Sequence, residues 1–175
     1  MVARFVRKSG ICILLVTLLL SQVFADESNT QRGATELARK NFMQALAVMG
    51  EAVESCEDKE KIIDIPRWEQ IGVSRESLLL GIVYFNLKLS NECTALAAKD
   101  LLIASKILEL GSSHDREKEP SRKFIDMILD SWWKELEAEA QYRYQVPTDI
   151  QKRIEMIHGL KEPFDMIKSW DASGN

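Results

Sequence analysis

The sequence has few of the side chains on which enzymes most often depend. It contains two histidines, His114 and His158, and neither a glycine-rich phosphate loop nor a Gly-x-Ser-x-Gly nucleophile motif. His114 lies beside Asp115 in a charged segment, which is typical of a solvated imidazole. His158 follows Glu155 by three residues, but a di-iron bundle needs a second Glu-x-x-His motif and two more helical glutamates. We therefore expect no metal site and no cofactor.

Carboxylates are the exception to this scarcity. Glu135, Glu137 and Glu139 alternate with other residues in a segment that we expect to be helical, which is typical of a solvated helix face. A glycosidase holds two carboxylates on opposite sides of a cleft, and the positions of carboxylates along a chain do not reveal such a cleft. A small envelope hydrolase that uses paired carboxylates is therefore an alternative to a protein without catalytic activity.

The chain also lacks an excess of positive charge. Its 23 Lys and Arg residues are outnumbered by 27 Asp and Glu residues, which gives a formal net charge of −4. Such a balance argues against nucleic acid and anionic lipid as partners, because neither phosphate surface attracts an acidic chain. With 46% apolar residues the chain is too hydrophobic for disorder, and its length suits one domain that buries about two-thirds of its unfolded surface.

No segment is long and apolar enough for a membrane span. The most apolar one, residues 11–20, has ten residues, whereas a span takes about 20. Basic residues precede it, and the small residues Val23 and Ala25 follow it at the spacing that a signal peptidase requires. We expect residues 1–25 to be a cleaved signal peptide, which makes the protein secreted or periplasmic. An uncleaved anchor is the alternative. The leader has three basic and no acidic residues, so the mature chain would carry −4 − 3 = −7.

Cysteine is almost absent as well. Of the three cysteines, Cys12 lies in the expected leader, and Cys56 and Cys93 remain in the mature chain. Export places these two in an oxidising compartment, where an even pair indicates a disulfide. The bridge would close a loop of about 38 residues and stabilise the fold by roughly 4 kcal/mol. Two buried free thiols are the alternative.

Helical periodicity is strongest over residues 74–110, the most apolar stretch outside the leader. Both halves of this stretch are apolar over more than one face, which indicates buried helices. We predict a hydrophobic helical hairpin here, capped by Ser74 and divided at Ser90 or Asn91, with one kinked helix as the alternative. The apolar residues at helical spacing are Leu78, Ile82, Phe85 and Leu89 in the first half, widened by Leu79 and Val83. In the second half they are Leu96, Ile103, Ile107 and Leu110, joined by Ala97, Leu101, Ala104 and Leu108.

This hairpin would form the centre of a compact all-α bundle of five to six helices, because no segment shows the two-residue alternation of a strand. The first helix has an apolar stripe that runs from Phe42 to Cys56. Thr148 and Gln151 have the spacing of a capping box at a later helix, which Gly159 would end. The expected organisation is a flexible lead over residues 26–33, a single helical domain over 34–170 and a flexible tail over 171–175.

Aromatic residues make up only 7% of the chain, but four of them lie close together in one predicted helix. Trp132 and Trp133 are adjacent and point about 100° apart, and Tyr142 and Tyr144 follow further along. Two interpretations are open, because the four rings could all cover the core or some could remain exposed as anchors for a partner. The second interpretation predicts a partner-binding surface with Trp133 as the anchor and Tyr142 and Tyr144 beside it.

These features together favour an exported, non-enzymatic helical binding module. Its partner would be another exported or envelope protein, for which the chain would serve as an adaptor, a chaperone or an inhibitor. The alternatives are the small hydrolase and a carrier whose helices open around an apolar ligand.

We expect the mature protein to begin at Asp26, because the basic, apolar and cleavage regions of a signal peptide are all present. N-terminal sequencing of the exported protein checks this expectation. Exported protein that still begins at Met1 would contradict it.

Overall fold

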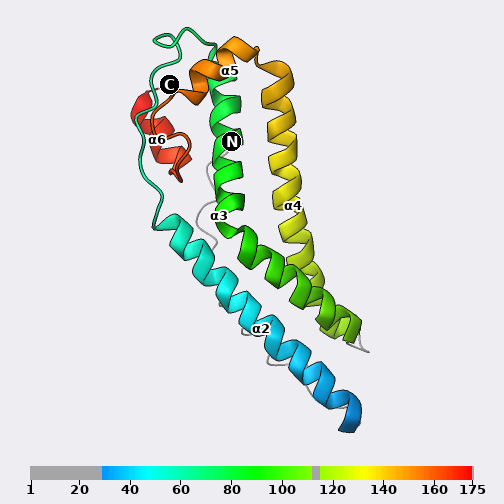
Figure 1. Ribbon diagram of the computed structural model, residues 1–175. Helices are drawn as coiled ribbons and strands as arrows, with labels where there is room; N and C mark the ends of the chain where they lie inside the picture. The colour runs from blue at the N-terminus through cyan, green and yellow to red at the C-terminus, as the bar shows by residue number, and fades with distance from the viewer. Residues whose placement is uncertain (1–28, 112–114, 175) are drawn as a thin grey trace.

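Helices account for almost all of the regular structure. The computed structural model describes residues 29–111 and 115–174, and the expected signal peptide and His114 lie outside these ranges. Within them the chain forms no strand and a single isolated bridge, so the prediction of an all-α bundle is confirmed. The five helices are α2 (Asn29–Glu57), α3 (Arg75–Gly111), α4 (Asp115–Gln145), α5 (Thr148–Glu155) and α6 (Met166–Ser173) (Figure 1).

The central stretch is one helix and not a hairpin. Helix α3 begins after Ser74 as predicted, with the Ser77 N–H donating to Ser74 Oγ at 3.1 Å, and it continues for 37 residues. Ser90 and Asn91 do not break it. Instead α3 bends about halfway along its length (Figure 1). Thr94 Oγ1 donates to the Ser90 carbonyl oxygen at 3.1 Å, a contact that often bends helices.

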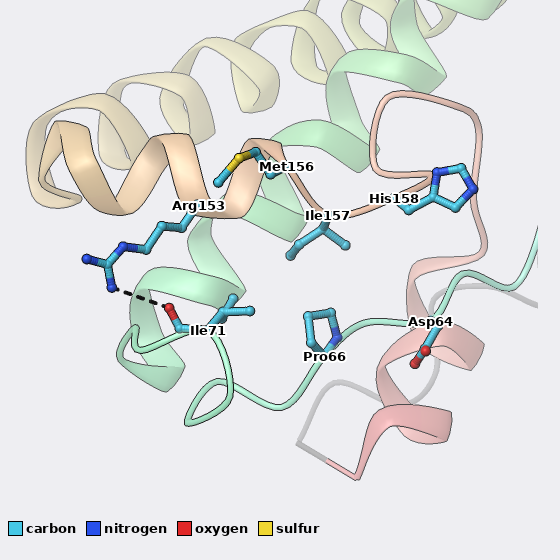
Figure 2. Close-up of a pocket in the computed structure, with 7 residues that line it drawn as sticks. All are labelled: Asp64, Pro66, Ile71, Arg153, Met156, Ile157 and His158. Carbon is cyan, nitrogen blue, oxygen red and sulfur yellow. Dashed lines mark hydrogen bonds between the residues drawn. The ribbon is translucent and has the colours of Figure 1, made fainter.

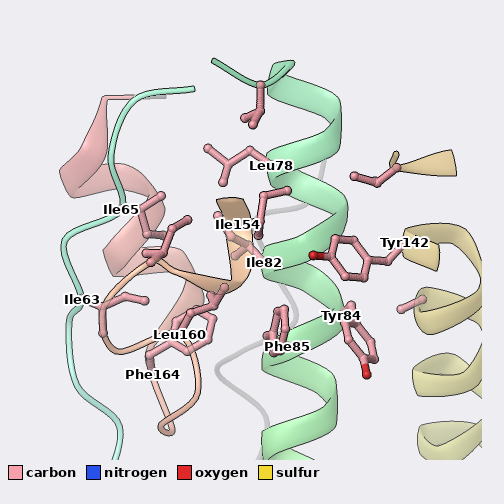
Figure 3. Close-up of a cluster of buried hydrophobic side chains, with 14 residues drawn as sticks. Ile63, Ile65, Leu78, Ile82, Tyr84, Phe85, Tyr142, Ile154, Leu160 and Phe164 are labelled. Carbon is pink, nitrogen blue, oxygen red and sulfur yellow. The ribbon is translucent and has the colours of Figure 1, made fainter. Parts of the chain in front are cut away.

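Helix α3 lies between α2 and α4, and both of these run antiparallel to it (Figure 1). Its first half packs with α4, α5 and the C-terminal segment around an upper apolar cluster, which Figure 3 shows. Its second half packs with α2 and with the first half of α4 around a lower cluster. The buried residues of the lower cluster are Ala38, Phe42, Ala98, Leu101, Ala104, Leu108 and Ile128.

The second half of α3 buries only one of the two apolar faces that the sequence predicts to be buried. Leu96, Ile103, Ile107 and Leu110 are exposed, by 49% or more of their surface, and the smaller Ala97, Ala98 and Ala104 are buried with Leu101 and Leu108. Both faces are apolar, so hydrophobicity alone does not choose between them. Small side chains let neighbouring helices approach more closely, and α2 and α4 therefore pack on the alanine-rich face.

A small polar network joins α3 to α4 between the two clusters. Asn91 is only 9% exposed, and its Nδ2 donates to the Glu135 carboxylate at 2.7 Å and to the Ser131 carbonyl oxygen at 3.3 Å. Ser131 Oγ donates to Asn91 Oδ1 at 2.8 Å. Glu135 therefore has a structural contact, although the sequence predicts a solvated face at this position. The buried amide has partners on α4 at this one register, so sliding of α3 along α4 would leave it unpaired.

The predicted disulfide between Cys56 and Cys93 is confirmed. It joins the end of α2 to the middle of α3, with the two Cα atoms 6.1 Å apart, a separation normal for a bridge. A crosslink that closes a loop of this length stabilises the fold by about 4 kcal/mol, mainly by restricting the unfolded chain. The bridge therefore holds the C-terminal end of α2 against the middle of α3.

Helices α2 and α6 extend further than the sequence predicts. Phe42 is fully buried on the predicted stripe of α2, but the helix already begins at Asn29, within the lead expected over residues 26–33. A helix that is held by packing extends readily into neighbouring polar residues. Helix α6 continues to Ser173 within the expected tail. Gly174, with φ of +66°, ends it in the left-handed conformation that favours glycine.

The connector after α2 is held by the C-terminal segment in an arrangement that we call the clasp, formed by residues 61–65 and 163–169. Lys61 and Phe164 form the isolated parallel bridge, and the Ile63 N–H donates to Ser169 Oγ at 3.0 Å. Ile63 and Ile65 are buried in the upper cluster. The clasp therefore joins the connector to the last part of the chain.

The predicted capping box of α5 does not form. Helix α5 begins at Thr148 without a side-chain cap, because the Gln151 side chain points to the end of α4. Gln151 Nε2 donates to the carbonyl oxygens of Val146 at 2.7 Å and Arg143 at 3.2 Å. Carbonyls at a helix C-terminus lack partners within the helix, so Gln151 satisfies α4 and joins the two helices.

Gly159→Ala should destabilise the protein, whereas Gly50→Ala should stabilise it. Gly159 has a φ of +85°, which costs other residues about 1–2 kcal/mol, and a Cβ there would lie 2.7 Å from Ile63 Cγ2 in the clasp. Gly50 lies inside α2, where a Cβ meets nothing within 4 Å and alanine gains about 0.5–1 kcal/mol. Urea unfolding of both variants measures the two signs. A Gly159→Ala protein as stable as the wild type would disprove this account of the clasp.

Candidate functional site

The structure separates the three aromatic residues that we grouped from the sequence. Trp133 is 69% exposed and Tyr144 is 90% exposed, whereas Tyr142 is 1% exposed. Residues two apart in a helix point about 200° apart, so Tyr142 and Tyr144 do not face the same side. The assignment of Tyr142 to a partner-binding surface is therefore wrong. Trp133 and Tyr144 have the exposure that such a role requires.

Tyr142 belongs to the upper cluster, where its ring meets two others (Figure 3). It stacks on Tyr84 with ring centres 5.3 Å apart and meets Phe85 edge-on at 6.0 Å. Its hydroxyl donates to the Gln151 carbonyl oxygen at 3.2 Å. Burial, and to a smaller extent the nearby Glu155 carboxylate, raise the pKa of Tyr142 above its ordinary value. Tyr142 therefore holds α4 to α3 and α5.

Trp133 is part of a longer row of exposed apolar side chains on α4. Leu129 is 47% exposed and Leu136 is 57% exposed. Steps of four and three residues keep such side chains on one side of a helix and are typical of a seam that packs against another helix. We call this row the α4 stripe, and its members are Leu129, Trp133, Leu136, Ala140 and Tyr144.

Acidic residues border one edge of the α4 stripe. Asp126, Asp130 and Glu137 are all exposed and follow one another at steps of four and seven residues, which places them on one line of the helix. Lys134 Nζ lies 2.6 Å from the Asp130 carboxylate. Asp126 and Glu137 have no such ion pair within the described ranges. The surface beside the stripe therefore has a net negative charge.

A hollow of about 470 Å³ opens between the connector and α5 (Figure 2). Arg153 Nη1 donates to the carbonyl oxygens of Ile71 and Gly72 at 3.4 and 3.2 Å, and the guanidinium therefore holds the connector to α5. Asp64 is the one carboxylate among the lining residues, so the hollow lacks the facing pair that the hydrolase alternative requires. The lining residues are Asp64, Pro66, Ile71, Arg153, Met156, Ile157 and His158.

A second hollow, of about 340 Å³, lies where α3, α4 and α5 meet, and aromatic rings line part of it. Glu92 and Glu155 are its carboxylates. Glu92 pairs with Lys88 at 3.7 Å one helical turn away, and Lys88 also lies 5.9 Å above the Tyr84 ring. Lys161 adds another positive charge beside them. Glu92 is therefore held by Lys88, and no serine, threonine or cysteine lines this hollow.

Neither a metal cluster nor a membrane-spanning helix is found among the residues that the structure describes. No group of three or more His, Cys, Asp or Glu side chains there is close enough to hold a metal ion. Glu155 and His158, the Glu-x-x-His pair, belong to no such group. No described helix is both long enough and apolar enough to cross a bilayer.

Compared with protein-family models, with curated proteins and with solved structures, the chain matches none of them.

Trp133→Ala should change the free energy of unfolding by no more than about 0.5 kcal/mol, the usual range for surface substitutions. Tyr142→Ala should cost about 3–5 kcal/mol, because it empties a buried aromatic position. Tyr144→Ala, two residues from Tyr142 but exposed, is the matched control and should behave like Trp133→Ala. Denaturant unfolding followed by circular dichroism measures all three. Equal losses for Trp133→Ala and Tyr142→Ala would show that Trp133 is also a core residue.

Proposed function

We propose that this protein is an exported, non-enzymatic binding module that docks a helix of another exported or envelope protein on the α4 stripe. The observation that carries the proposal is the exposure of Trp133 and Leu136 at the centre of a continuous apolar row. Contiguous exposed apolar surface often marks a contact site. Tryptophan is also among the residues that contribute most to binding energy at interfaces.

The partner that best fits the α4 stripe is an amphipathic helix with basic residues beside its apolar face. The stripe extends from Leu129 to Tyr144, which corresponds to about 22 Å of helix, and an apolar helix face of similar length would cover it. Lysine or arginine residues on the partner would meet the acidic edge formed by Asp126, Asp130 and Glu137. A second copy docked through the same stripe would instead set these carboxylates against each other, and like charges disfavour that pairing.

An adaptor, a chaperone or an inhibitor would each use such a surface. The disulfide between Cys56 and Cys93 supports the exported location, because disulfides persist mainly in oxidising compartments. The competing hydrolase has less support, since the larger hollow is lined by a single carboxylate and one of the two carboxylates in the smaller hollow, Glu92, is paired with Lys88.

Trp133→Ala should weaken partner binding by about 2 kcal/mol or more, which is roughly thirtyfold in the dissociation constant. Immobilised wild-type protein would capture proteins from the exported fraction of its host, in parallel with a Trp133→Ala/Leu136→Asp double variant. Proteins that the double variant fails to capture would then be purified. Titration calorimetry with the wild type and Trp133→Ala would give the two dissociation constants.

Leu79→Ala is the matched control, because Leu79 is an exposed apolar residue (42%) on α3, away from the α4 stripe. This variant should bind the partner as the wild type does. Asp126→Lys/Glu137→Lys should weaken binding and reduce its dependence on salt, since it removes the acidic edge. A partner that binds the wild type, Trp133→Ala and Leu79→Ala equally well would exclude the α4 stripe as its docking site.

A further inference from the structure

The hollow where α3, α4 and α5 meet has walls that are held in place by contacts between these helices. Tyr84 and Tyr142, which line it, stack on each other with ring centres 5.3 Å apart, and Phe85 lies beside them (Figure 3). The Tyr142 hydroxyl donates to the Gln151 carbonyl oxygen at 3.2 Å, which joins α4 to α5. Sites for small molecules are usually concave and largely pre-formed. This hollow has both properties.

Five charged side chains line the hollow, and three of them have an ion pair. Lys88 and Glu92 lie 3.7 Å apart on α3. Arg143 lies 2.7 Å from Glu139, which is about one turn earlier on α4. These three charges are therefore already neutralised within the chain.

The other two charged residues, Glu155 and Lys161, have no ion pair within residues 29–111 and 115–174. Glu155 is half-buried at the end of α5, and Lys161 is exposed six residues further along the chain. Burial removes part of the water that would solvate the Glu155 carboxylate, so this carboxylate gains from a cationic partner in the hollow. The hollow therefore offers one carboxylate and one ammonium group to a ligand.

We propose that this hollow binds a free amino acid with an apolar side chain, whose ammonium meets Glu155 and whose carboxylate meets Lys161. A simple anion would leave Glu155 unpaired and a simple cation would leave Lys161 unpaired, whereas a zwitterion satisfies both charges. The apolar side chain of the ligand lies against Leu89, which is half-buried, and against the aliphatic stem of Lys88.

The volume of the hollow favours a single amino acid over a longer peptide. It is about 340 Å³, near the lower end of the range of about 300–1,000 Å³ for small-molecule sites. None of the residues that line it belongs to the α4 stripe. This site is therefore independent of the proposed function.

Phenylalanine is the probe, and the purified full chain is titrated with it by calorimetry. The dissociation constant should be about 2 mM or lower, as expected for a ligand of this size. The amide signals of Leu89, Glu155 and Lys161 should shift in the NMR spectrum. N-acetylphenylalanine lacks the ammonium and phenylalaninamide lacks the carboxylate, so each should bind at least about fivefold more weakly than phenylalanine.

Two variants assign the charges. Glu155→Gln should weaken the binding of phenylalanine and phenylalaninamide at least about fivefold and leave that of N-acetylphenylalanine unchanged, because only the first two have an ammonium. Lys161→Gln should weaken the binding of phenylalanine and N-acetylphenylalanine and leave that of phenylalaninamide unchanged. Lys152→Gln and Glu51→Gln are the matched controls, because both residues are exposed and neither lines the hollow. These controls should bind phenylalanine as the wild type does.

Three results would overturn the proposal. They are the absence of binding at about ten times the expected dissociation constant, amide shifts that lie away from the hollow, and losses in Glu155→Gln and Lys161→Gln that are equal for all three ligands. The last result would show that the two residues have only a structural role. Trp133→Ala should leave phenylalanine binding unchanged, so this site and the docking of a partner on the α4 stripe are tested separately.

Discussion

Apolar contacts alone would let α3 slide along α4, because both helices present apolar side chains to each other over much of their length. The amide of Asn91 removes this freedom, since Ser131 and Glu135 lie within its reach at only one register. Two residues further along α3, the bridge from Cys93 to Cys56 fixes α2 at the same level of the molecule. The Asn91 contacts and the disulfide lie between the upper and lower clusters. Together they fix the positions of α4 and α2 relative to α3.

Local chemistry made part of this fold predictable. Ser74 caps α3 and Cys56 pairs with Cys93, because a hydroxyl before a helix and an even pair of thiols each have one favoured partner. The buried face of the second half of α3 was not predictable in this way. The apolar pattern placed both Ile103 and Ala104 inside, but the close approach of α2 and α4 selected the face with Ala104.

At the candidate site, too, the sequence predicts only in part which side chains are buried and which are exposed. Trp132 and Trp133 are equally hydrophobic, and only the position of α3 decides that Trp132 packs against the lower cluster and Trp133 faces outwards. Tyr142 is a different case, since its angle from Tyr144 already places the two rings on different sides of one helix.

The clasp determines when the protein can finish folding. The N–H of Ile63 finds its acceptor, Ser169, 106 residues further along the chain. A ribosome adds about 5–20 residues per second, so a growing chain waits for seconds with Ile63 and Ile65 uncovered after the connector has been made. Helices α2, α3 and α4 can form during that interval, because their hydrogen bonds are local. A chain that is terminated before Ser169 would keep them but would lose the acceptor of the Ile63 N–H and the Trp170 ring that packs against the upper cluster.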